Sequence, residues 1–240
     1  MHPRSDPSDA RSMHSGVLLN HESLEMRAYK KLSSISIFLL LFYTLPLIGA
    51  PSLLGTWPLL TLAFFCTVLF ATQPPLSVKD SRAHKGTDGW TTWLIIGVSG
   101  FGQIFSLVEW AYFRGSPQLF DAWAISGLAL LTFGTAFRLW AIRTLDRAFS
   151  ATVQIKVGQQ LVTSGPYRWL RHPSYTGALL AMIGAALLMH SYFGLVLMGP
   201  GMLLVYMRRI AVEESALERW FGDQYRALQM VTKRLVPFIW

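Results

Sequence analysis

Apolar residues gather into six segments along the chain, and polar or proline-containing turns separate them. The segments cover residues 32–48, 53–71, 90–113, 123–142, 175–189 and 192–206. A helix rises about 1.5 Å per residue and a hydrocarbon core is about 30 Å thick, so the last two segments are only just long enough to cross. We therefore predict an all-α integral membrane protein with about four spanning helices and a C-terminal helical hairpin, which either spans or forms a shallow re-entrant pair.

Helix-breaking and interfacial residues support these boundaries. The double proline Pro74-Pro75 cannot continue a helix, so the second segment is expected to end before it. Pro200 and its flanking glycines lie within an apolar run and predict a kink or close helix packing rather than a phosphate loop. Aromatic residues near the ends of the third segment predict interfacial belts. These are Trp90, Trp93, Trp110 and Tyr112.

Composition agrees with a membrane protein. Of the 240 residues, 52% are hydrophobic and only 14% are charged, which lies outside the usual range of soluble proteins. The first thirty residues contain no apolar run of seven or more, so no cleavable signal peptide is expected. The single cysteine, Cys66, excludes an intramolecular disulfide and is expected to be a small buried or lipid-facing side chain.

The distribution of charge predicts the orientation. If segments one to four each cross once and the hairpin crosses twice, Arg114 alone among the 21 basic residues falls on the second side. Cytoplasmic loops carry such an excess of Lys and Arg, and one Arg at a helix centre costs about 2.5–3.5 kcal/mol on insertion scales. We expect both termini and the working face to be cytoplasmic, so the net charge of +8 reflects topology and no nucleic-acid partner is predicted.

The first cluster of candidate chemistry precedes the hairpin. Pro173 suits the first position of a helix and His172 would then cap it, which would leave the amides of Ser174 and Tyr175 free to bind an anion. Cationic side chains stand nearby at Arg168 and Arg171. The alternative is that these basic residues only anchor a loop to lipid phosphates.

The second cluster follows the hairpin and contains Glu213 and Glu214. Arg209 and Glu213 are four residues apart, so a local salt bridge worth about 0.2–0.5 kcal/mol is the simplest interpretation. Adjacent helical residues point about 100° apart, so one glutamate could make that bridge while the other faces a ligand. A ligand with one anionic and one cationic end would suit the two clusters together.

The C-terminal half, from about residue 134 to residue 240, resembles the isoprenylcysteine carboxyl methyltransferases. That superfamily also contains phospholipid N-methyltransferases and small-thiol methyltransferases. The resemblance rests on Gly165-Pro166-Tyr167, Arg171-His172-Pro173-Ser174-Tyr175, Arg209 followed by Glu213-Glu214, Leu217, Phe221-Gly222, Tyr225 and Val236-Pro237-Phe238-Ile239.

The resemblance implies a methyltransferase that binds S-adenosylmethionine in a cytosolic pocket and receives a lipophilic methyl acceptor from the bilayer. The implied cofactor-binding residues are Leu161, Val162, Gly165, Pro166, Tyr167, His172, Tyr175 and Glu213. The implied catalytic residues are Arg171, Arg209, Glu213 and Glu214, with Arg209 orienting the acceptor. The expected division is a polar cytoplasmic tail (1–31), N-terminal transmembrane helices (32–130) and a catalytic region (131–240).

The most direct functional hypothesis is methylation of the carboxylate of a prenylcysteine-like or other lipophilic acceptor. An anionic acceptor needs no general base, whereas an amine would give Glu213 or Glu214 a proton to remove. Alternatives are a phospholipid or small-thiol methyltransferase, and a non-catalytic membrane protein that holds a lipid headgroup. A sterol-reductase-like NADPH enzyme is a further alternative, although that group usually has Asn where Ser174 stands. The six histidines show no ligand spacing, so no metal site is predicted. The sequence gives no indication of the oligomeric state.

Overall fold

The computed structural model describes residues 26, 29, 31–72, 89–115, 120–146 and 160–236. The N-terminal half contains an apolar helix, Lys31–Leu47, whose last turns are irregular at η1 (Leu40–Thr44) and η2 (Leu45–Leu47). The remaining elements of this half are η3 (Pro51–Gly55), α2 (Trp57–Ala71), α4 (Gly89–Val108), η4 (Glu109–Phe113) and α5 (Ala122–Leu145). Most of the polar tail and the predicted break at Pro74-Pro75 lie outside the described residues.

The C-terminal half contains the helical hairpin and two further short helices. Its elements are η6 (Gly165–Arg168), α6 (Pro173–Leu188), α7 (Tyr192–Val196), η7 (Leu197–Gly201), α8 (Met202–Phe221) and α9 (Asp223–Val231). The part of the chain that the structure describes contains no strand, and its single isolated bridge joins Leu170 to Lys233. The predicted all-α class is confirmed.

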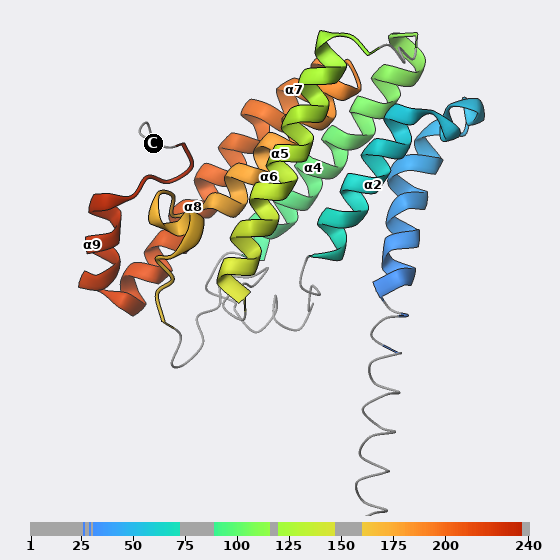
Figure 1. Ribbon diagram of the computed structural model, residues 1–240. Coiled ribbons are helices and arrows are strands. Elements are labelled where there is room, and N and C mark those ends of the chain that lie inside the picture. The colour runs from blue at the N-terminus through green and yellow to red at the C-terminus, as the bar shows by residue number, and fades with distance from the viewer. Residues whose placement is uncertain are drawn as a thin grey trace, which may run out of the picture.

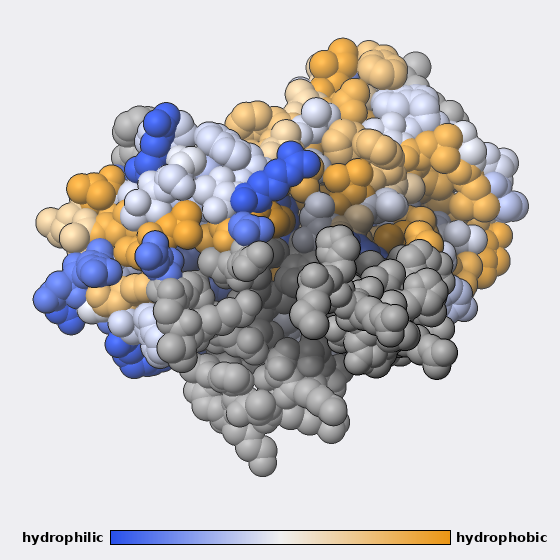
Figure 2. All heavy atoms as spheres, turned by 60° about the horizontal axis from the view of Figure 1, so that its bottom comes forward, coloured by the Kyte–Doolittle hydropathy of each residue, from blue (hydrophilic) through white to orange (hydrophobic). Residues whose placement is uncertain are grey.

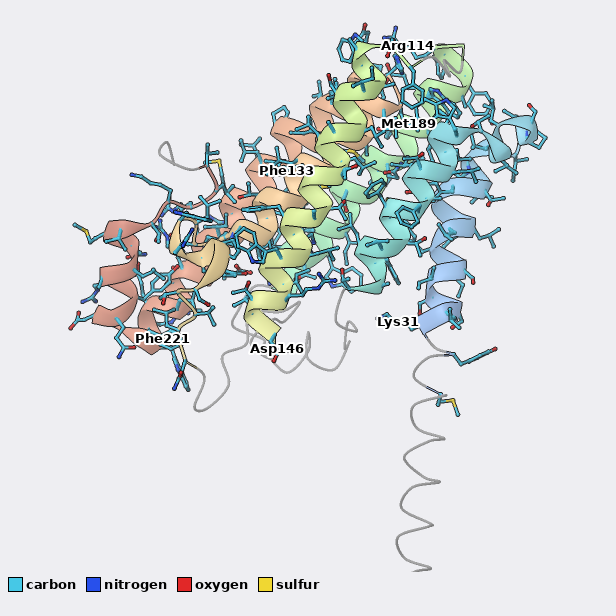
Figure 3. The ribbon with its side chains drawn as sticks, in the orientation of Figure 1. Lys31, Arg114, Phe133, Asp146, Met189 and Phe221 are labelled. Atoms are coloured by element: carbon cyan, nitrogen blue, oxygen red, sulfur yellow. The ribbon has the colours of Figure 1, made fainter. Side chains whose placement is uncertain are left out.

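The long helices stand side by side and alternate in direction (Figure 1). Lys31, Asp146 and Phe221 lie toward the lower end of the bundle, whereas Arg114 and Met189 lie at its upper end (Figure 3). Six apolar segments that run alternately up and down predict this distribution of their ends between the two sides of the bundle. The two ends of the hairpin therefore return to the same end of the bundle.

Three helical stretches are long and apolar enough to cross a membrane: Trp90–Phe113, Ala122–Leu145 and Tyr192–Phe221. The third and fourth predicted segments are confirmed within three residues. Shorter apolar helices are Lys31–Leu47, Trp57–Ala71 and Pro173–Leu188. The 16 residues of α6 extend about 24 Å, so this arm of the hairpin is the short one. Full crossing by the shorter helices stays a prediction.

Glycines allow α5 and α6 to pack with their backbones in contact. A Cβ atom added to Gly127 or Gly134 of α5 would lie less than 3.0 Å from backbone atoms of α6. The same holds in reverse for Gly177 and Gly184 of α6 against α5. Each pair is seven residues apart, two helical turns, so both glycines of a helix lie on one face. This close contact positions the start of α6, where the candidate site begins.

The second arm of the hairpin is one long helix with an irregular turn. The turn, η7, has π-helical hydrogen bonding and contains Pro200, which cannot donate the usual backbone hydrogen bond. This agrees with the kink predicted from the sequence. The belt prediction is wrong for Trp110, which is fully buried in the bundle core, whereas Trp90, Trp93 and Tyr112 are exposed.

The upper end of the bundle is closed by a buried carboxylate. Glu109 accepts hydrogen bonds from Ser191 Oγ at 2.5 Å, from the Phe193 amide at 3.0 Å and from the Tyr192 amide at 3.2 Å. Arg114 Nε lies 3.9 Å from Glu109 Oε1. These contacts tie the end of the third apolar segment to the turn of the hairpin.

The surface divides into an apolar and a polar part. Viewed with the lower end forward, hydrophobic residues dominate the right and upper surface, and hydrophilic residues gather on the left, over α8 and α9 (Figure 2). Large exposed apolar side chains occur on most of the bundle helices, as expected where a surface borders lipid. The polar part therefore marks where the bundle leaves the apolar environment.

Candidate active site

The first predicted cluster stands at the start of α6. His172 is the N-cap residue and Pro173 is the first helical residue, as the sequence predicts. The prediction of free amides is wrong for Tyr175, because its N–H donates to the His172 carbonyl at 3.1 Å. The carboxylates around His172 also disfavour an anion there, so the start of α6 is not an open anion site.

The second cluster stands directly against the first. His172 Nδ1 lies 3.5 Å from Glu213 Oε2, and His172 Nε2 lies 3.5 Å from Glu214 Oε1. Burial lowers the pKa of the imidazole, but the two carboxylates outweigh burial and raise the His172 pKa above its ordinary 6.5. The two glutamates therefore flank a single buried histidine.

Glu214 accepts hydrogen bonds from two arginines that come from distant parts of the chain. Arg171 Nε donates to Oε1 at 2.7 Å, and Arg234 Nε donates to Oε2 at 2.9 Å. The Glu214 side chain is 5% exposed, so both of its oxygens are satisfied inside the protein. A buried carboxylate is tolerated only with such pairing.

Glu213 is held by Arg209 and Tyr175. Arg209 Nε donates to Glu213 Oε1 at 2.8 Å, and the Tyr175 hydroxyl donates to the same oxygen at 2.5 Å. The simple Arg209–Glu213 bridge is therefore present. Arg209 is 2% exposed and also donates to the hydroxyls of Thr91 and Thr92 at the start of α4. This residue links α8 to α4 as well as to the second cluster.

The segment after α9 completes the arrangement. It runs back beside the loop that precedes α6, where the Arg171 amide donates to the Lys233 carbonyl at 2.7 Å and the His172 amide to the Arg234 carbonyl at 3.1 Å. The Arg171 guanidinium also donates to the Thr232 carbonyl at 2.5 Å. In Figure 1 the loop that precedes α6 lies close to α9. Three chain segments thus meet at the lower end of the bundle.

We refer to six side chains as the charged cluster: Arg171, His172, Arg209, Glu213, Glu214 and Arg234. Five of them belong to the motifs noted in the sequence. The sequence did not single out Arg234, nor the hydroxyls of Thr91, Thr92 and Thr232. No local pattern could have found these residues, because each makes its contact across more than fifty positions except Arg234, which bonds to Glu214 at a separation of 20.

The other residues expected to hold a cofactor lie just before the charged cluster. Pro166 and Tyr167 are buried, and Leu161 and Val162 are half-buried. Burial raises the pKa of Tyr167, and the negative charge of Glu213 raises it further. The Tyr167 phenol therefore lies close enough to the charged cluster to interact with it electrostatically. Gly165 has φ +57°.

Two buried polar atoms beside or within the charged cluster are left without a hydrogen bond in the described part of the chain. They are His172 Nε2 and the Tyr225 hydroxyl. Buried polar groups are normally hydrogen-bonded, so such atoms indicate hydrogen-bonding capacity for a polar ligand. The cluster also supplies cations for a carboxylate and carboxylates for a cation, which is the donor set that a zwitterionic ligand needs.

Comparisons with known proteins match the part of the chain that contains most of the charged cluster. Residues 122–224 match the model of the phospholipid methyltransferase family. A probable protein-S-isoprenylcysteine O-methyltransferase from Oryza sativa subsp. japonica is 30% identical over 127 residues, which are 51% of this chain and 66% of that protein. The protein-S-isoprenylcysteine O-methyltransferase of Tribolium castaneum is 31% identical over 170 residues, which are 70% of this chain and 58% of that protein.

The chain belongs to the isoprenylcysteine carboxyl methyltransferase family. The eukaryotic intramembrane Ras methyltransferase ICMT shares its fold, with a TM-score of 0.58 and 20% identity over 98% of this chain and 88% of that chain. The matched parts span two thirds or less of the curated relatives' own length. Within this isoprenylcysteine carboxyl methyltransferase family member, residues 122–224 contain the whole charged cluster except Arg234.

Proposed function

We propose that the protein is an S-adenosylmethionine-dependent membrane methyltransferase that acts on the carboxylate of a prenylcysteine-like or other lipophilic acceptor. The observation that carries the proposal is the charged cluster, in which Glu213 and Glu214 flank His172 at the end of an apolar helical hairpin. Relatives named as protein-S-isoprenylcysteine O-methyltransferases support the reaction class.

The residues around the cluster fit a zwitterionic cofactor. His172, Tyr175 and Glu213 would hold its amino-acid end, and Leu161, Val162 and the Gly165-Pro166-Tyr167 loop would line the adenosine. The fit rests on the unused hydrogen-bonding capacity of His172 Nε2 and Tyr225 and on the mixed charges of the cluster. When bound, S-adenosylmethionine supplies an electrophilic methyl group on a sulfonium.

Arg209 is the residue proposed to orient an anionic acceptor. It is buried and paired with Glu213, so an acceptor carboxylate would have to share or replace that partner. An acceptor carboxylate is already a nucleophile, so no side chain needs to remove a proton. Burial of the cluster keeps water away from the reacting charges, and positioning supplies the remaining acceleration.

The site is proposed to face the cytoplasm, with both termini on that side. The support is the charge split predicted from the sequence, in which Arg114 alone of the 21 basic residues falls on the second side, together with the position of Arg114 at the upper end of the bundle (Figure 3). A reporter domain fused after Trp240 should be active in the cytoplasm, and a reporter placed beside Arg114 should not. The reverse pattern would reject the orientation.

The reaction is tested with S-adenosylmethionine labelled in its methyl group. Purified full-length protein is incubated with a farnesylated cysteine analogue or with total membrane lipid, and the product is treated with base. Release of labelled methanol from the prenylcysteine product supports a carboxyl methyl ester. Cofactor binding without transfer to any acceptor would instead favour a protein that only holds a lipid headgroup.

Phospholipid N-methylation is the second candidate, favoured by the family model that matches residues 122–224. In that case the labelled methyl group is transferred to lipid, and base treatment does not release it as methanol. Glu213 or Glu214 would then remove a proton from the amine. Glu213→Gln and Glu214→Gln, measured separately, would distinguish the two reactions, because a carboxylate acceptor loses only a binding contact in either variant whereas an amine acceptor loses its base in one of them. The pH dependence of transfer would change shape in the second case only.

A further inference from the structure

Two arginines predicted to stand near the first cluster have opposite environments. Arg171 points into the charged cluster and is paired with Glu214 at 2.7 Å. Arg168, three residues earlier, is exposed, and its guanidinium carbon lies 3.8 Å from the centre of the Trp169 ring. Within the described ranges Arg168 makes no ion pair with a carboxylate. Among the described residues, the Arg168 guanidinium therefore contacts an aromatic ring and is not neutralised by a carboxylate.

Trp169 is the first member of an aromatic row that continues up α5. Its ring contacts Trp140 edge-on, with centroids 6.2 Å apart at 71°. Trp140 contacts Phe137, and Phe137 stacks on Phe133, each with centroids 5.9 Å apart. Residues 133, 137 and 140 share one face of α5. Trp169, Trp140 and Phe133 are 45%, 43% and 58% exposed, so the row lies on the outer surface.

The row runs from the middle of the bundle to its lower end. Phe133 lies partway along α5, and Asp146 marks the end of that helix (Figure 3). Trp140 is five residues before the end of α5, the level at which tryptophans meet lipid headgroups. Arg143 follows Trp140 by three residues, is exposed and lies on the same side of the helix. Along α5, the cationic Arg143 therefore lies nearest the lower end, Trp140 lies one turn above it, and Phe137 and Phe133 lie farther toward the middle of the bundle.

We propose that Arg168, Trp169 and Trp140, with Arg143, form a binding site for an anionic glycerophospholipid. The phosphate of the headgroup would meet the two guanidinium groups, and an acyl chain would lie along Trp140, Phe137 and Phe133. The aromatic row selects a lipid over a free phosphate, because a soluble ion makes no use of it. The charge of Arg168, which no carboxylate neutralises among the described residues, selects an anionic over a zwitterionic headgroup.

The lipid site is joined to the charged cluster through a short piece of backbone. A Cβ atom on Gly165, which begins the loop, would lie 2.9 Å from Thr144 Oγ1 and 3.5 Å from Trp140 Nε1, so the loop packs directly on α5. The Trp169 carbonyl accepts from the Lys233 amide at 3.0 Å, two residues before Arg171 enters the cluster. Lipid bound on the outside would thus steady the loop that leads into the cluster.

The test titrates the detergent-purified full chain with phosphatidylglycerol or with phosphatidylcholine of equal chain length. Apparent affinity is taken from the melting temperature, and amide exchange at Tyr167 and Trp169 locates the lipid. The wild type should prefer phosphatidylglycerol and show slower exchange with it. Arg168→Gln should lower that preference about five-fold, the value of one basic side chain near an anionic surface. Arg168→Lys should retain most of it.

Matched variants distinguish this site from general surface charge. Arg226→Gln removes an exposed arginine of α9 that is paired with Asp223, and it should leave the preference unchanged. Trp169→Leu should weaken phosphatidylglycerol binding about two-fold or more through loss of the stacked ring. Equal affinity of the wild type for both lipids, an equal loss in Arg226→Gln, or full competition by inorganic phosphate would each overturn the proposal.

Discussion

Arg171 Nε donates a 2.7 Å hydrogen bond to Glu214 Oε1, although 43 residues separate the two positions. The contact joins the loop before α6 to α8, and Arg234 approaches the same carboxylate from the chain beyond α9. Three separate segments therefore depend on one buried carboxylate. Loss of its charge would remove the carboxylate that these two guanidinium groups share.

Glu214→Gln should destabilise the protein by about 3 kcal/mol, because breaking a buried ion pair leaves the other charge uncompensated. The measurement is thermal unfolding of the purified protein in detergent. Asp223→Asn is the matched control, since its pair with Arg226 is 95% and 67% exposed and should contribute nothing measurable. Equal stability of both variants would show that the Glu214 contacts do not hold the segments together.

The raised pKa of His172 predicts a pH-dependent stability. Because the folded-state pKa exceeds the unfolded value of 6.5, the stabilisation by the imidazolium is complete below that pH. It is lost as the pH rises from 6.5 through the raised folded-state pKa. Melting temperatures measured across this range should fall more steeply for the wild type than for His172→Gln. Parallel curves for the two proteins would mean that His172 is not charged between the glutamates.

Gly134→Ala should destabilise the α5–α6 contact by about 1–3 kcal/mol, because the added methyl would overlap the backbone of α6 near Ala181. Gly97→Ala is the matched control within an apolar helix. A Cβ atom there meets nothing within 4 Å, so that variant should be about 0.5–1 kcal/mol more stable. Thermal unfolding of both in one detergent gives the comparison, and the two effects must have opposite signs.

Glu109→Gln should lower stability by about 1–3 kcal/mol without weakening S-adenosylmethionine binding. The carboxylate satisfies Ser191 and two backbone amides at the upper end, and an amide group offers only one acceptor oxygen. The charged cluster lies at the start of α6, whereas Met189, just past the end of α6, lies at the upper end of the bundle with Arg114 (Figure 3). Calorimetric affinity for the cofactor and the melting temperature are measured on the same preparation. Weaker S-adenosylmethionine binding by a variant of unchanged melting temperature would contradict the prediction that Glu109 acts on stability alone.

The sequence alone was sufficient for the helices and for the start of the site. Apolar runs and proline positions predict segments because hydrophobic burial and missing backbone donors act locally, and Pro173 begins α6 with His172 as its cap. The family resemblance also emerged from motifs. Because the hairpin consists of two consecutive apolar segments, the sequence also predicts that its two ends lie on the same side of the membrane. Arg209 and Glu213 pair as their spacing of four predicts.

The tertiary structure decided which of these charged groups face one another. Arg168 and Arg171 are indistinguishable by type, yet one lies on an outer tryptophan and the other beside Glu214. The close α5–α6 packing at Gly134 and Gly177 likewise depends on both helices. Partners chosen across dozens of residues depend on helix rotation, tilt and separation. Those quantities are set by the packing of the whole bundle, and no local pattern contains them.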